Sequence, residues 1–462
     1  MSTKPVVKKT ENMTQDELLL HVIRLLKDHQ RDALAELLDE LQPYDIAQLY
    51  AELPDKHRSR FLNMLDSRSL ALLLQELERP LQLEALQKME PGKFSQALNL
   101  MDNDDLADLL GEMTSERKDE LLGMMRQEES SGVQNLLKYS PETAGGIMTD
   151  RYVWIRRYYT VREAVEKLKN FAEIAENLYY LYVLDEQKVL VGVVSYRDLL
   201  LADPGDRIED IMYSRVISVP VHMDQEQVAR TIERYDFLSV PVVDDDGRLV
   251  GIVTVDDVVD VLIQEAAEDI GKLAATGKTI DFHTGAIQAA LTRLPWLVLL
   301  LFLGIMSGNI ISQFEDTLHK VVALAYFMPM IAGMTGNTGT QSLAVVVRGL
   351  MTQRVNRGTV IRLLRREAGV GFIIGCVCGV LITVIVALWQ QHLMLGIVVG
   401  VSLFLTLLIG TLAGTVIPLI LYRFRVDPAI ASGPLITTLN DMFSITVYFG
   451  TATLFLSNIM PG

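Results

Sequence analysis

The chain has few cysteines and, for its length, little positive charge. Cys376 and Cys378 are the only cysteines among 462 residues, and both lie in an apolar run. Because they are two positions apart on a helix, their side chains point to different faces, so we expect small apolar residues and no disulfide between them. The 58 acidic residues outnumber the 42 basic ones. Because phosphates are bound by clusters of Lys and Arg, we expect no nucleic-acid partner.

Motifs of catalysis and secretion are also missing. The seven histidines are dispersed, no H-E-x-x-H occurs, and no Ser or Cys lies in a recognisable nucleophile motif. The N-terminal stretch, MSTKPVVKKTENMTQDELLL, has no apolar core of signal-peptide length. We therefore expect a protein that is not an enzyme and whose N-terminus lies in the cytoplasm.

Charge divides the chain into an acidic part and an apolar part. Residues 291–462 hold ten basic and five acidic residues, a net charge of +5, while residues 1–290 hold 32 basic and 53 acidic residues, a net charge of −21. We predict a multidomain protein with four parts. These are an all-α superhelical domain (1–142), an α/β domain of two similar modules (143–263), an acidic connecting helix (264–290) and an α-helical transmembrane domain (291–462).

A short repeat of constant spacing runs through the first part. Leu or Met occupies every twelfth position, at Leu41, Leu53, Leu65, Leu77, Met89, Met101, Met113 and Met125. This period leaves about nine residues of helix and three of turn, and predicts short helices stacked in a superhelix. Asp104 and Asp108 share one helix face, where like charges are destabilising unless a cation or basic group bridges them.

The second part consists of two similar halves. VGVVSYRDLL at 191–200 matches VGIVTVDDVV at 250–259, so that position 191 of the first half corresponds to position 250 of the second. Each half predicts two short strands joined by a polar turn and followed by a helix. The helices start at Ser195-x-x-Asp198 and Thr254-x-x-Asp257, which have the pattern of a capping box.

These halves resemble a pair of CBS modules. The resemblance implies a cleft for an adenine nucleotide such as ATP. Asp198, and by position Asp257, would hold the ribose, Arg197 would meet phosphate, and Tyr180 and Phe237 would flank the base. Helix capping explains the same aspartates without a nucleotide, and no phosphate-binding motif supports the site.

Five apolar segments follow, each reaching the roughly 20 residues that a spanning helix needs. They cover about 294–312, 321–347, 368–389, 396–422 and 430–460. Arginines gather in 348–367 and at 423–429, which places these loops in the cytoplasm. We expect a multi-pass membrane protein with a cytoplasmic N-terminus and an extracytoplasmic C-terminus.

Asp441 lies in the middle of the last apolar segment. A lone carboxylate at mid-membrane costs at least ~2.5 kcal/mol, and no Lys or Arg lies inside a span to balance it. A protonated aspartate and a proton relay are alternatives, but a bound cation is favoured. Nearby hydroxyl, amide and carbonyl oxygens, Asn440 among them, suit a hard cation. Pro329 and three glycines in the second segment predict an interrupted helix that lines a cavity.

The order of these parts, with GNTGTQ at 336–341 and DPAIASGPLITTLND at 427–441, resembles the MgtE family of magnesium transporters. The resemblance implies a homodimeric Mg²⁺ channel in the lipid bilayer of a bacterial inner membrane, with a pore lined by Asp441, Asn337, Gly433 and Thr437. It also implies gating by cytoplasmic Mg²⁺ at a set of carboxylates. By position these are Asp104, Asp108, Asp224, Glu226, Asp236, Asp257, Asp260, Glu265, Glu268, Asp269 and Asp427. Thr335 and the pair Ile263-Gln264 depart from the family's usual pattern.

Two other functions are compatible with the sequence. One is a coupled transporter for another divalent cation, although no relay of acids favours it. The other is a membrane-anchored nucleotide sensor, whose spans only hold the CBS pair. The substitution Asp441→Ala distinguishes them, because a sensor would keep nucleotide binding whereas a channel would lose transport.

Overall fold

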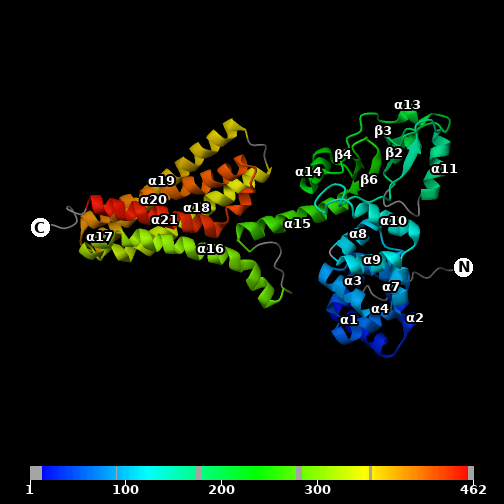
Figure 1. Ribbon diagram of the computed structural model, residues 1–462, viewed down its shortest axis with the longest axis horizontal. Helices are drawn as coiled ribbons and strands as arrows, with labels where there is room; N and C mark the ends of the chain where they lie inside the picture. Colours follow the sequence, from blue (N-terminus) through cyan, green and yellow to red (C-terminus); the bar gives the residue numbers. More distant parts are fainter. Residues whose placement is uncertain are drawn as a thin grey trace. The chain divides into compact units, whose positions relative to one another are not determined.

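The computed structural model describes residues 13–89, 91–111, 113–171, 178–276, 284–352 and 356–455. The chain divides into two compact units, Met1–Leu262 and Ile263–Gly462, and each is described by itself. Helix α15 (Val255–Leu273) runs from the first unit into the second (Figure 1). The segment predicted as one connecting helix, 264–290, is therefore not one element, because α15 ends at Leu273 and α16 begins at Ala286.

Short helices of nearly equal length build the first part of the first unit. They are α1 (Gln15–Lys27), α2 (Arg31–Leu38), α3 (Pro43–Glu52), α4 (Asp55–Met64), α5 (Ser67–Glu76), α6 (Arg79–Lys88), α7 (Pro91–Leu98), α8 (Asn103–Gly111), α9 (Ser115–Gly123) and α10 (Gln127–Leu136). From α3 onward a helix starts at every twelfth position, from Pro43 to Gln127. The predicted repeat is confirmed.

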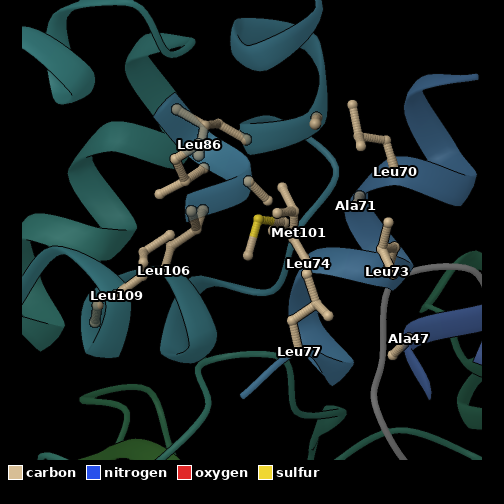
Figure 2. Packing of buried hydrophobic residues seen from close by; sticks show 14 of the residues in the cluster. Ala47, Leu70, Ala71, Leu73, Leu74, Leu77, Leu86, Met101, Leu106 and Leu109 are labelled. Carbon is tan, nitrogen blue, oxygen red and sulfur yellow. The ribbon is translucent and has the colours of Figure 1, made fainter. Parts of the chain in front are cut away.

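The repeated Leu and Met residues lie where one helix ends, and they face the interior. Leu53, Leu65 and Met101 are at most 4% exposed. Figure 2 shows Met101 converging with Leu74, Leu86 and Leu106. Burial of each such side chain contributes about 1.5–3 kcal/mol. Because the turn between helices has the same length in each repeat, every helix buries the same face. These faces together form one continuous hydrophobic core.

The turn between α4 and α5 is stabilised by a side-chain cap. At Asp66, the carboxylate caps α5 by accepting a hydrogen bond from the Ser69 N–H at 2.8 Å. Such a cap satisfies one of the N–H groups that a helix leaves unpaired at its start. A short polar residue after the buried Leu65 therefore both ends one repeat and begins the next.

Two three-stranded sheets form the rest of the first unit. The first has the order β1 (Trp154–Arg156), β2 (Tyr180–Leu184), β3 (Leu190–Ser195), and the second the order β4 (Val219–Pro220), β5 (Ser239–Val243), β6 (Leu249–Thr254). In both, the first strand is parallel to the second and the last two form a hairpin. The helices are α11 (Val161–Phe171), α12 (Tyr196–Leu201), α13 (Ile208–Ile211), α14 (Gln225–Tyr235) and α15.

The hairpins confirm the predicted correspondence of the two halves. Strands β2 and β5 begin at Tyr180 and Ser239, and β3 and β6 begin at Leu190 and Leu249. The two strands of each pair are separated by the same number of residues as positions 191 and 250. The parallel strands β1 and β4 escaped the sequence interpretation because they are only three and two residues long.

The turns of the two hairpins are built alike. The Asp185 carboxylate accepts hydrogen bonds from the N–H groups of Gln187 and Val189, both at 2.9 Å. Asp244 accepts the equivalent bonds from Asp246 and Arg248 in the second module. An aspartate at the start of the turn thus closes each hairpin with its own side chain.

The second unit is helical. Its elements after α15 are α16 (Ala286–Ser312), α17 (Glu315–Lys320), α18 (Leu324–Thr352), α19 (Arg357–Trp389), α20 (Leu393–Arg423), the 3₁₀ turn η1 (Pro428–Ile430) and α21 (Gly433–Leu454). Each of the five predicted apolar segments contains one long helix. Among the described residues, α16, α19 and α20 are long and apolar enough to cross a membrane. Five spans stay a prediction, since α18 and α21 carry more polar residues.

Helix α18 corrects the prediction of an interrupted second segment, because it is continuous across Pro329. Its glycines instead allow close packing. A Cβ on Gly336 would lie 2.8 Å from the Thr437 methyl carbon of α21, and one on Gly339 would meet the Asn440 amide. The predicted arginine-rich loop 348–367 is also largely helical, since it contains the end of α18 and the first turns of α19.

Candidate ion path and regulatory carboxylates

The first turns of α21 are rich in hydroxyl groups, yet remain helical. Pro434 lies in the first turn, where its missing N–H is not needed. The Thr437 and Thr438 hydroxyls donate hydrogen bonds to the carbonyls of Gly433 and Pro434, at 2.9 and 2.8 Å. Asp441 follows two turns after Gly433, about 12 Å along the helix axis. These hydroxyls can still accept hydrogen bonds or contact a cation through their free lone pairs.

The Asp441 carboxylate has no protein partner within the described part of the chain. Its side chain is half-buried, and no hydrogen bond or ion pair joins it to another described residue. Of the other predicted pore residues, Asn337 is exposed on α18, and Gly433 and Thr437 are half-buried. The structure thus places Thr437 beside α18, but records no direct contact between Asn337 and Asp441.

Asn440, which the sequence suggested as a further cation ligand, is packed between helices instead. Its side chain is fully buried, and its Nδ2 donates a hydrogen bond to the Thr335 carbonyl of α18 at 3.4 Å. A Cβ on Gly410 of α20 would lie 3.6 Å from the same nitrogen. Asn440 therefore holds α21 against its neighbours, and this contact decides which way Asp441 faces.

Glu367 is a buried acid that the sequence interpretation missed, because it was assigned to a loop. It lies in α19 and is only 4% exposed. Ser342 Oγ of α18 donates a hydrogen bond to its Oε2 at 3.0 Å, and the Arg366 guanidinium donates two to its Oε1 at 3.0 and 2.7 Å. The charge of Glu367 is thus balanced within the protein, unlike that of Asp441.

The predicted gating carboxylates are spread over both units. Asp104 and Asp108 lie on α8. Asp224 caps the start of α14, Glu226 lies in its first turn, and Asp236 caps its end. The residues on α15 are Asp257, Asp260, Glu265, Glu268 and Asp269, and Asp427 caps η1. Glu226 pairs with Arg230 at 2.5 Å. Among the described residues, no three His, Cys, Asp or Glu side chains gather closely enough to hold a metal ion.

Asp257 has a perturbed carboxyl group. Burial raises the pKa of Asp257 to about 6, and the charges of Asp256 and Asp105 add to this. Hydrogen bonds from the Thr254 hydroxyl and N–H oppose the rise. Burial also raises the pKa of Asp105, which lies on α8 and accepts a hydrogen bond from Gln75 at 2.6 Å. Asp105 was not predicted as a functional residue, although its neighbour Asp104 was.

We expect Asp257→Asn to stabilise the first unit at neutral pH. In the unfolded chain an Asp has a pKa of about 3.9, so between pH ~4 and ~6 the folded chain binds more protons than the unfolded one. The free energy of unfolding of the wild type therefore falls as pH rises through this window. Asn removes the dependence and should add about 1–3 kcal/mol at neutral pH.

Urea unfolding of the fragment 1–276 at acidic pH, near 4.5, and at neutral pH measures this effect. Asp260→Asn, an exposed carboxylate on the same helix, is the matched control and should change little under either condition. Equal stability changes for Asp257→Asn at both pH values would contradict the assignment.

The predicted nucleotide residues lie in described segments of both modules. Ser195 Oγ donates a hydrogen bond to Asp198 Oδ2 at 2.6 Å and accepts one from the Asp198 N–H at 3.1 Å, so the predicted cap is confirmed. Arg197 is exposed and Tyr180 is half-buried. Phe237 stacks on Tyr235, with ring centroids 5.4 Å apart.

A lysine lies among the acidic residues at the end of α15. Lys272 Nζ is 2.8 Å from Asp427 Oδ2 and 3.1 Å from Glu268 Oε1. Burial lowers the pKa of Lys272, but the hydrogen bonds to Asp427 and Glu268 outweigh it and raise the pKa above its usual value. The ion pair of Glu268 and Lys272 could have been predicted from the sequence, because the two residues lie four positions apart on one helix. Asp427 is too distant in sequence to have been connected to it.

Comparison with known families matches three of the four predicted parts of the chain. Residues 328–451 match MgtE, described as a divalent cation transporter, and residues 41–142 match the MgtE intracellular N domain. Residues 144–205 and 208–264 each match the CBS domain, which confirms the resemblance of the two halves to CBS modules.

Relatives of full length agree with these matches. The chain is 56% identical over 449 residues to the magnesium transporter MgtE of Bacillus subtilis (strain 168), covering 97% of this chain and 100% of the relative. It is 38% identical over 450 residues to the magnesium transporter MgtE of Thermus thermophilus, covering 96% and 100%.

Two similar solved structures are soluble parts. The soluble part of a magnesium transporter is 41% identical, with a TM-score of 0.52, and the match covers 55% of this chain and all of that one. The cytosolic domain of the Mg²⁺ channel MgtE in complex with ATP is 39% identical, with a TM-score of 0.51, covering 53% and 99%.

Proposed function

The chain belongs to the MgtE family of divalent cation transporters, and we propose that it is a channel through which Mg²⁺ enters a bacterial cell. The family is one of transporters, in agreement with the prediction that the chain is not an enzyme. One observation in this chain carries the proposal. Asp441 is a half-buried carboxylate on α21, and the described residues offer it no basic or hydrogen-bonding partner. A cation is the partner that balances its charge.

Mg²⁺ suits this site for a chemical reason. It releases its water shell reluctantly and is bound through one or two carboxylates with several waters retained. One copy of the chain supplies only one carboxylate at this depth of α21, so we propose a homodimer in which both Asp441 side chains face the pore. Asn337, Gly433 and Thr437 would provide oxygens to the retained waters.

We further propose that cytoplasmic Mg²⁺ closes this pore. The superhelical domain (1–142), the CBS pair (143–263) and the connecting segment (264–290) carry the entire acidic excess, a net charge of −21. When Mg²⁺ is scarce, the carboxylates predicted above repel one another, and when it is abundant the ions bridge them and favour one arrangement. The arginines at the start of α19 favour a cytoplasmic side for this end of the helix. The N-terminus would then be cytoplasmic and the C-terminus extracytoplasmic, in the plasma membrane.

We also propose that the CBS pair binds ATP. The support is the solved MgtE cytosolic domain with ATP, together with Asp198 at the start of α12. There the Asp198 carboxylate can accept hydrogen bonds from the ribose hydroxyls. Calorimetric titration of the full chain with ATP should show binding that Asp198→Ala weakens at least about tenfold, since a hydrogen bond to a charged group is worth about 1.5–3 kcal/mol. Equal binding by both proteins would leave Asp198 as a helix cap only.

Uptake into liposomes tests the main proposal. Vesicles with the full chain should accumulate Mg²⁺ faster than empty vesicles, and Mg²⁺ on the cytoplasmic side should slow the uptake. A coupled transporter for another divalent cation would instead require a second ion gradient. A membrane-anchored nucleotide sensor would show ATP binding without uptake.

A further inference from the structure

The end of α15 is packed against the helices that carry the predicted pore residues. Leu273 contacts an apolar cluster formed by Leu343, Val347, Ala429, Ala431 and Ile436, which come from α18, η1 and α21 and the turn between the last two. The Leu273 carbonyl oxygen would lie 3.5 Å from a Cβ on Gly433, the first residue of α21. All of these residues belong to the second unit.

The C-terminus of α15 is also capped by hydrogen bonds. Ala275 adopts a left-handed backbone conformation, with φ of 55°, and is 7% exposed. The Thr276 N–H and hydroxyl both donate hydrogen bonds to the Gly271 carbonyl, at 3.0 and 3.1 Å. Such an arrangement satisfies the last carbonyls of a helix and gives its end a defined position.

Lys272 adds a charge contact to this apolar one. Its ammonium bridges Glu268 on α15 and Asp427, which caps η1. The other Asp427 oxygen, Oδ1, accepts a hydrogen bond from the Ala429 N–H at 2.9 Å. Because both carboxylates touch one nitrogen, their oxygens are at most about 6 Å apart, a distance at which like charges repel unless a cation lies between them.

We propose that Lys272 is a built-in counter-ion that holds the end of α15 against the base of α21 without a divalent cation. This rests on the proposed function, in which Glu268 and Asp427 are gating carboxylates. The lysine occupies the position between them that a bridging cation would take. Gating ions therefore reinforce a contact that already exists, and the Mg²⁺ needed for closure is set partly by Lys272.

Hydrogen exchange of the full chain in detergent tests the proposal without any transport assay. In EDTA, the amides of residues 268–276 should exchange about tenfold faster in Lys272→Gln than in the wild type, because one charge-assisted contact is lost. Adding Mg²⁺ should slow exchange in this variant, since the ion can now enter between Glu268 and Asp427. Lys272→Arg keeps the positive charge and should stay close to the wild type.

Two further variants make the outcome decisive. Lys320→Gln removes a lysine from the end of α17 and should leave the exchange of residues 268–276 unchanged. The charge exchange Lys272→Glu with Asp427→Lys should restore slow exchange in EDTA. Equal rates for the wild type and Lys272→Gln in EDTA would overturn the proposal. Absence of Mg²⁺ uptake by the wild type would overturn the proposed function and leave the exchange result intact.

Discussion

Replacing Asp441 with alanine is expected to reduce Mg²⁺ uptake into liposomes by at least about 100-fold. Each copy of the chain would lose one carboxylate that contacts the hydrated ion, and a hydrogen bond to a charged group is worth about 1.5–3 kcal/mol. Two copies lose this twice at one site. The folded protein should survive the change, because Asp441 makes no side-chain hydrogen bond or ion pair among the described residues.

The matched control is Asp316→Ala, which removes an exposed carboxylate from α17. This variant should transport Mg²⁺ like the wild type. Size-exclusion chromatography in detergent verifies that both variants remain intact. Normal uptake by Asp441→Ala would show that this carboxylate is not part of the ion site, and the proposed pore would have to be abandoned.

The stacked helices and the two hairpins of the first unit could be predicted because their signals are local. A hydrophobic residue at every twelfth position determines both the length of each helix and the face that it buries, and α3 to α10 follow this period throughout. The two hairpins are likewise encoded by short β-branched strands and by aspartates that accept hydrogen bonds from their own turns. Such patterns need no knowledge of distant contacts.

The details of the candidate site depend on contacts between distant segments. Asn440 and Asp441 are adjacent polar residues, and composition alone makes both of them candidate ligands. They differ because successive side chains on a helix point about 100° apart, and only Asn440 faces α18. In the same way, the glycines of α18 indicated a broken helix until their neighbours on α20 and α21 were known. Lys272 and Asp427 are separated by most of the second unit's sequence, beyond the reach of any local pattern.

Gly414→Ala is expected to disrupt the helix packing that supports Asp441. A Cβ on Gly414 of α20 would meet the backbone of Gly339 on α18, colliding with the carbonyl oxygen and lying 2.9 and 3.0 Å from its carbonyl and α carbons. Backbone atoms in the middle of two packed helices cannot move aside as a flexible side chain can. The two helices must therefore separate, and we expect a loss of stability of about 1–3 kcal/mol or more.

Thermal unfolding in detergent and Mg²⁺ uptake measure the two consequences of this separation. The melting temperature of Gly414→Ala should fall, and its uptake should fall with it, because Gly339 and Asn440 belong to the same contact between α18, α20 and α21. Gly450→Ala is the matched control, since a Cβ on Gly450 of α21 would have no atom within 4 Å. That variant should keep both properties. If Gly414→Ala melted and transported like Gly450→Ala, the close approach of α18 and α20 would not be what orients Asp441.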